Sequence, residues 1–159
     1  MSFRFRVAAG FAVLAISAGL AAAPARAASL SGVWQVAVTP VDCTSGAPLA
    51  PAFTSLLGFA ANGTESEDTN NPALAVGQRS TAFGVWTKTG AATFHMDEFA
   101  LILFTSSGPH PIPAGSQQIH QDITLSGSTW SSVATIQFYD TNGNPTVSGC
   151  ATAAASRLS

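Results

Sequence analysis

GVWQVAV, residues 32–38, is the stretch of this sequence that decides the fold. Trp34, Val36 and Val38 occupy alternate positions, as expected of side chains that share one face of a β-strand. Similar segments, separated by turn residues, follow along the chain as far as Arg157. Regularly spaced short strands of this kind predict an all-β domain built as a barrel or a sandwich.

Turn residues divide the chain into segments of strand length. Asn62-Gly63 and the run 140–143 are hairpin signals, because tight hairpin turns need residues that tolerate positive φ. The prolines and glycines of residues 105–115 cannot continue a β-ladder. We therefore predict eight strands, at residues 32–41, 52–60, 64–68, 79–87, 91–104, 116–125, 129–139 and 145–157.

The two cysteines bear on how these strands are arranged. Short links predict antiparallel neighbours, and eight such strands can close into an up-and-down barrel or form a two-sheet sandwich. Cys43 and Cys150 lie near the two ends of the strand-forming region, and we expect them to form one disulfide. A barrel brings its first and last strands together, so this pairing favours the barrel over the sandwich.

The first 27 residues have the pattern of a signal peptide. Arg4 and Arg6 precede an uncharged apolar run, and Ala25-Arg26-Ala27 fits a small-x-small cleavage site. We expect cleavage after Ala27, a single domain over residues 28–159, and a secreted or periplasmic protein without a membrane span in the mature chain.

Loss of that leader would leave an acidic domain. Removing three of the six basic residues takes the net charge from −2 to −5. The remaining basic side chains are Arg79, Lys88 and Arg157. Nucleic acid is therefore excluded as a partner, since phosphate binding needs clustered Lys and Arg.

Gly32-Val33-Trp34 on the first strand, together with Arg157 on the last, resembles the lipocalins and their wider relatives, the calycins. The resemblance implies an eight-stranded antiparallel barrel in a small exported bacterial protein. It also implies that Trp34 closes the barrel floor and that Arg157 packs over its indole by a cation–π contact. Such barrels leave room inside for side chains or for one small ligand.

Histidine and aspartate mark the sharpest candidate for chemistry. His95 and Asp97 share a face of one predicted strand, and His120 and Asp122 share a face of the next. If the register aligns them, the four groups converge in a set suited to metal binding or acid–base catalysis. The alternative is that both pairs stand on the solvent face of the barrel.

The face that points inward depends on the hairpin near Gly90, since a slip of one residue exchanges the two faces. A two-residue loop puts Trp86 on the face of His95, Asp97, Phe99, Leu101 and Leu103. A three-residue loop with a bulge puts it on the face of Phe94, Met96, Glu98 and Ala100.

No metal-binding, phosphate-binding or nucleophile motif occurs, so we predict no cofactor and no metal site.

The leading hypothesis is a binding protein for a small, mainly apolar ligand, with loops 44–51, 69–78 and 105–115 around the mouth of the pocket. The alternatives are a barrel-type cyclase or isomerase, using the His and Asp pairs above with Glu98, and a packed extracellular interaction or inhibitor module. The candidate ligand-binding residues are Phe83, Trp86, Phe99, Leu101, Trp130 and Phe138.

Overall fold

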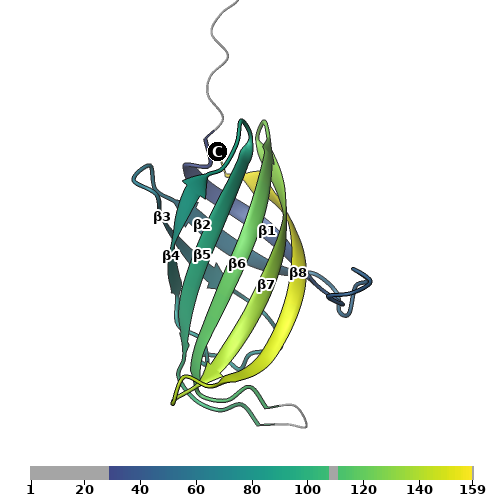
Figure 1. Ribbon diagram of the computed structural model, residues 1–159, viewed down its shortest axis with the longest axis vertical. Coiled ribbons are helices and arrows are strands. Elements are labelled where there is room, and N and C mark those ends of the chain that lie inside the picture. The colour runs from purple at the N-terminus through teal and green to yellow at the C-terminus, as the bar shows by residue number, and fades with distance from the viewer. Residues whose placement is uncertain (1–28, 108–110, 159) are drawn as a thin grey trace, which may run out of the picture.

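The computed structural model describes residues 29–107 and 111–158, and these form a closed eight-stranded antiparallel barrel (Figure 1). The predicted signal peptide and its cleavage site lie outside the described residues. All eight predicted strands are present. They are β1 (Gly32–Val41), β2 (Phe53–Phe59), β3 (Thr64–Thr69), β4 (Ala82–Lys88), β5 (Thr93–Ile102), β6 (Gly115–Ser126), β7 (Thr129–Asp140) and β8 (Pro145–Arg157).

Each strand pairs with its neighbours in sequence, and β1 closes the barrel against β8. Trp34 lies opposite Arg157, and Val41 lies opposite Cys150. Cys43 and Cys150 form a disulfide that links residues 107 positions apart beside this seam. The barrel, the antiparallel pairing and the disulfide are thus confirmed, and the sandwich is excluded.

One end of the barrel is closed by Trp34 and Arg157. The Trp34 indole is fully buried, and its Nε1 donates to the carbonyl of Leu30 at 2.8 Å. The Arg157 guanidinium lies 4.1 Å from the centre of the indole ring, and it also donates to the carbonyls of Ser29 and Ser31. Gly32 has a φ of 133°, and a Cβ atom there would collide with this guanidinium.

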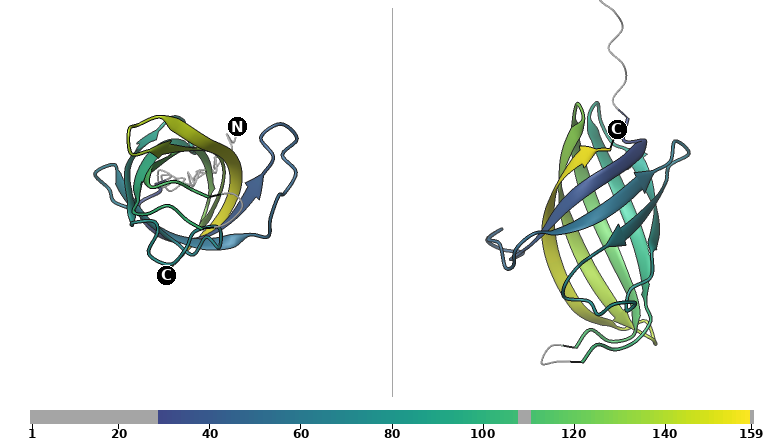
Figure 2. Two further views of the ribbon diagram at one scale, coloured as in Figure 1. Left: turned by 90° about the horizontal axis from the view of Figure 1, so that it is seen from below. Right: turned by 180° about the vertical axis from the view of Figure 1, so that it is seen from behind.

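The main apolar core lies directly behind this closed end. Trp34 and Trp130 contact each other with ring centres 6.1 Å apart, and smaller apolar side chains fill the space around them. The connections at this end are short, whereas the longer loops between β3 and β4 and between β5 and β6 gather at the opposite end (Figure 2). The two ends therefore differ: one is plugged by aromatic side chains and the other is covered by loops.

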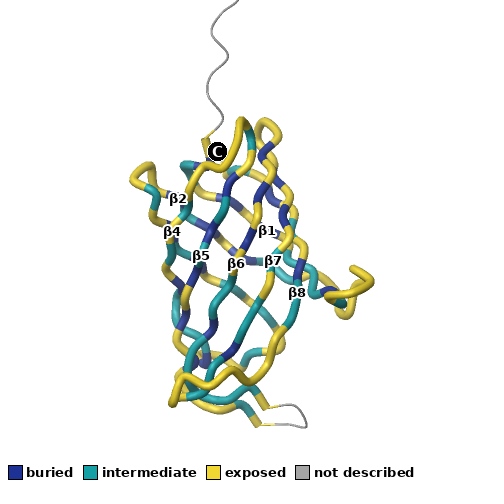
Figure 3. Tube along the Cα trace, in the orientation of Figure 1, coloured by how far each residue is buried: buried dark blue, intermediate teal, exposed yellow. Residues whose placement is uncertain are grey.

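The hairpin between β4 and β5 fixes which side chains point inward. Trp86 lies opposite Met96, so it shares the inner face with Phe94, Met96, Glu98 and Ala100. Thr89 N–H donates to the Thr93 carbonyl at 2.9 Å, which leaves three residues in the loop, although Gly90 does not adopt positive φ. Along β5 and its neighbours, buried positions accordingly alternate with more exposed ones (Figure 3).

The bounds of two strands differ from those predicted. The strand expected from residue 79 begins at Ala82, and the strand expected over 91–104 is shortened to Thr93–Ile102. Arg79 and Ile102 meet only as an isolated antiparallel bridge outside the two strands. Within the described ranges, no helix has the length and apolar character needed to cross a membrane.

Candidate functional site

A cavity of about 250 Å³ lies inside the barrel, between the aromatic core and the loop-covered end. Its wall comes mostly from the inward faces of β1, β2, β6, β7 and β8, which present apolar side chains. Among these are Val36, Val38, Leu57, Ile119, Ile136 and Phe138. A largely apolar, concave wall with a few polar groups is the usual character of a small-molecule site.

Two loops complete the cavity at the loop-covered end of the barrel. Leu74, from the loop before β4, and Ile112, from the loop before β6, both line it. The fully buried Gln78 holds these loops together, because its Nε2 donates to the Phe104 and Ile112 carbonyls at 3.1 and 3.3 Å. Loops 69–78 and 105–115 therefore contribute to the cavity as expected. Loop 44–51 supplies no lining residue.

A charged cluster is set into the cavity wall at Arg79. Its Nη2 donates to Glu67 Oε2 at 2.6 Å and to Glu98 Oε1 at 2.5 Å, and its Nε donates to Gln117 Oε1 at 2.6 Å. All four side chains line the cavity. The charged side chains are almost completely buried, so the cluster depends on mutual pairing rather than on water.

Burial shifts the protonation of this cluster. Removal from water raises the pKa of Glu98 well above its ordinary value, and the neighbouring Glu67 raises it further, against the opposing effect of Arg79. Arg79 Nη1 is buried and has no hydrogen-bond partner among the described residues, so one donor of the cluster is unsatisfied there.

Glu65 is a second buried acid, on the same inner face as Glu67. Burial, reinforced by the charge of Glu67, raises the pKa of Glu65 to about 8. Both of its carboxyl oxygens are buried and have no hydrogen-bond partner within residues 29–107 and 111–158. Gly84 lies opposite it, and a Cβ atom on Gly84 would collide with the Glu65 carboxyl. The small residue therefore makes the space that this carboxyl occupies.

The six candidate ligand-binding residues divide into three groups. Phe138 lines the cavity. Trp86 and Trp130 also point inward, but they pack within or against the core cluster instead of lining the cavity. Phe83, Phe99 and Leu101 are 67%, 43% and 50% exposed, so their expected inward orientation is wrong. They occupy the other set of alternate positions, which the β4–β5 register turns outward.

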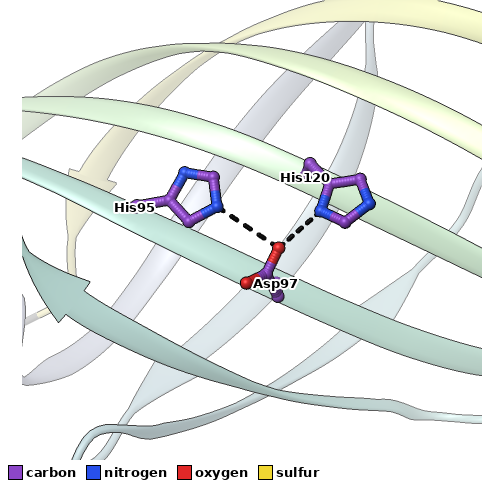
Figure 4. A group of neighbouring side chains, drawn as sticks. All are labelled: His95, Asp97 and His120. Carbon is purple, nitrogen blue, oxygen red and sulfur yellow. Dashed lines mark hydrogen bonds and ion pairs between the residues drawn. The ribbon is translucent and has the colours of Figure 1, made fainter.

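The predicted histidine and aspartate pairs do converge, but on the outer surface. His95 lies opposite Asp122, and Asp97 lies opposite His120, on β5 and β6. His95 Nδ1 is 2.8 Å from Asp122 Oδ1. Figure 4 shows the second contact, in which His120 Nδ1 is 2.5 Å from Asp97 Oδ1. The Asp122 hydrogen bond is the main cause of a raised pKa of His95. Asp97 conversely has a lowered pKa, chiefly through its bond to His120.

Apart from Glu98, sequence reasoning missed the charged part of the cavity wall. Arg79 was expected only as the start of a strand, and Glu65 and Glu67 fell within the predicted strand at residues 64–68 without a role. The alternation of Glu65 and Glu67 was the available signal, because two residues two apart on a strand share a face. Gln117 carries no comparable signal in the sequence.

No protein-family model matches this chain, and no curated protein matches it either. Its function must therefore be argued from its own residues.

Proposed function

We propose that this chain is an exported binding protein for a small, mainly apolar and uncharged molecule that occupies the barrel cavity. The observation that carries the proposal is the cavity of about 250 Å³, with an apolar wall interrupted by the Arg79 cluster. Burial of the ligand's apolar surface would supply the affinity, and the polar group would fix its orientation. The lipocalin-like pairing of Trp34 with Arg157 is in keeping with this proposal.

The preference for an uncharged ligand follows from the charges already present. Arg79 is paired with Glu67 and Glu98, so a ligand carboxylate would compete with them instead of meeting an unpaired cation. A ligand cation would meet the Glu98 carboxyl group, whose burial disfavours ionisation. A carbonyl or ether oxygen needs no counter-charge and could accept from the unpartnered Nη1 of Arg79.

The disulfide and the leader sequence support export. Structural disulfides persist in oxidising compartments, and Cys43–Cys150 is one. The first 27 residues follow the signal-peptide pattern. We therefore place the protein in the periplasm or outside the cell.

A cyclase or isomerase is the second candidate, and it rests on Glu98 alone among the residues expected for it. Glu98 lines the cavity and has a raised pKa, which is the state required of a buried general acid. His95, Asp97, His120 and Asp122 lie on the outer surface and cannot act inside the barrel. A fully packed interaction or inhibitor module is less well supported, since it gives the cavity no role.

Fluorescence titration with two dyes tests the binding proposal. N-phenyl-naphthylamine is uncharged, and anilinonaphthalene sulfonate carries the same ring system with a negative charge. We expect the uncharged dye to bind more tightly. Equal or tighter binding of the sulfonate would contradict an uncharged ligand class.

A cavity-filling variant locates the bound dye. Gly149 lines the cavity, and a Cβ atom there meets nothing within 4 Å, so Gly149→Phe places a ring in open space. We expect it to weaken dye binding at least about tenfold. Val133→Phe adds the same ring on the outer surface and is the matched control. Equal binding by both variants would show that the dye does not use the cavity.

A further inference from the structure

The outer surface of β5 and β6 carries a second possible site, which is independent of the cavity. His95 Nε2 lies 3.3 Å from Asp97 Oδ1, and His120 Nδ1 lies 2.5 Å from the same oxygen (Figure 4). One ligand atom from each of these three residues lies within 4.8 Å of the others. Two imidazole nitrogens and one carboxylate oxygen form a donor set that suits zinc and similar divalent ions.

The hydrogen bond to Asp122 prepares His95 to act as a ligand. An ionised carboxylate only accepts hydrogen bonds, so His95 must donate its Nδ1–H to Asp122 across 2.8 Å. In a neutral imidazole this places the lone pair on Nε2, which faces the Asp97 carboxylate. Two electron-rich atoms that face each other favour a cation between them. A carboxylate that orients a histidine in this way is the usual support of a zinc ligand.

The spacing also fits. With metal–ligand distances of about 2.0–2.1 Å, two ligands of a tetrahedral ion are about 3.3–3.4 Å apart. The 3.3 Å between His95 Nε2 and Asp97 Oδ1 already has this value. To complete the site, His120 Nδ1 would exchange its proton for the ion and move away from Asp97, and the three ligand atoms, which lie within 4.8 Å of one another, would adjust to the same spacing.

The surroundings leave room for the ion. The outward side chains paired with this group on β4 and β7 are Val85, Thr87, Val133 and Thr135, none of which is charged. His95, Asp97 and His120 are between about one third and one half exposed, so water could complete the coordination. The rigid pairing of β5 with β6 holds all three ligands on one face.

We propose that His95, Asp97 and His120 bind one zinc-type divalent ion on the outside of the barrel, with Asp122 orienting His95. This proposal departs from our expectation of no metal site, which rested on the absence of a sequence motif. The ligands come from two strands whose alignment only the barrel provides. The ion would also cross-link β5 to β6 without entering the cavity.

Calorimetric titration of the untagged protein with Zn²⁺ tests the proposal. We expect one ion per chain, and Co²⁺ in its place should give a visible absorption band of tetrahedral or five-coordinate character. His95→Ala should weaken Zn²⁺ binding at least about tenfold, and Asp122→Asn should weaken it by about 10-fold to 100-fold. Absence of binding up to about 1 mM Zn²⁺, where the binding free energy is only about 4 kcal/mol, would overturn the proposal.

Two controls make the result specific. His110 is the third histidine of the chain and is not one of the proposed ligands, so His110→Ala should bind Zn²⁺ as the unaltered protein does. Gly149→Phe fills the cavity on the other side of the wall and should also leave Zn²⁺ binding unchanged. Loss of binding in His110→Ala, or unchanged binding in His95→Ala, would assign the ion elsewhere and refute the site.

Discussion

Two charged clusters lie on opposite faces of β5, one residue apart in sequence. Glu98 points into the barrel and joins Arg79 and Glu67, whose charged side chains have almost no contact with solvent. Asp97 points outward and joins the two histidines in a group that is about half exposed. The same strand thus carries a desolvated cluster and a hydrated one.

The difference teaches how burial changes the role of a charge. In the inner cluster, removal from water is the largest influence on Glu98, and it favours the neutral acid. In the outer cluster, hydrogen bonds dominate, and they favour ionised Asp97 and protonated His95. The inner cluster therefore loses stability when protons leave, and the outer cluster loses stability when its carboxylate gains one.

The largest expected effect comes from breaking the inner cluster. Arg79→Ala leaves Glu67 and Glu98 buried without their cation, and we expect it to lower the free energy of unfolding by about 3–5 kcal/mol. Urea denaturation at neutral pH measures this. A loss below about 1 kcal/mol, the size typical of an exposed pair, would show that the inner cluster is effectively hydrated.

Replacing the whole inner cluster sharpens that test. We expect Glu67→Leu, Arg79→Met and Glu98→Leu together to cost much less than Arg79→Ala alone, and the triple variant could be neutral or more stable by about 1–4 kcal/mol. The same denaturation experiment decides this. If the triple variant is less stable than Arg79→Ala, the cluster stabilises the barrel beyond satisfying its own charges.

The pH dependence of stability separates the two faces by an effect that is smaller for each pH unit. The pKa of Glu65 is about 8 in the folded protein and about 4.5 when the chain unfolds, so the folded state holds the proton more tightly. Stability should therefore fall as pH rises from 4.5 to 8, by at most about 1.4 kcal/mol for each pH unit. Glu65→Gln should flatten this slope in melting curves. An unchanged slope would assign it to another group.

The smallest effect is expected from the outer cluster in the absence of metal. The lowered pKa of Asp97 contributes stability above its unfolded value of 3.8, and this contribution is lost as pH falls below it. Asp97→Asn should reduce the free energy of unfolding at neutral pH by less than about 1 kcal/mol, since the pair is exposed. Denaturation in the presence of a chelator measures it. A cost equal to that of Arg79→Ala would abolish the distinction between the two clusters.

The barrel could be predicted because the sequence patterns that indicate strands and turns are local and recur along the chain. Alternating side chains mark the strands, turn residues mark their ends, and the two cysteines indicate which ends meet. The outer His and Asp group could be anticipated for the same reason, since residues two apart share a face. Its convergence depended on the β5–β6 register, and the structure supplies a register that aligns all four groups.

The contribution of β5 to the cavity wall could not be predicted, because the orientation of its side chains depends on one hairpin. Three residues between Thr89 and Thr93, instead of two, turn Glu98 inward and Phe99 outward. Hydrophobicity alone does not choose between these faces, since Phe83, Phe99 and Leu101 would also suit an interior. Arg79 was missed because it precedes β4, where the strand pattern carries no information about orientation.

The contacts of Arg157 have a consequence for the order of the strands. This side chain donates to the carbonyls of Ser29 and Ser31, and the amide of Leu158 donates to the carbonyl of Val33 at 2.9 Å. The two ends of the described chain are thus neighbours. The strands form a closed ring, so the ring could begin at any strand. A short linker between these ends, with a new opening in the exposed turn at Asn142 and Gly143, would give a circular permutant with the same ring of strands and the same cavity.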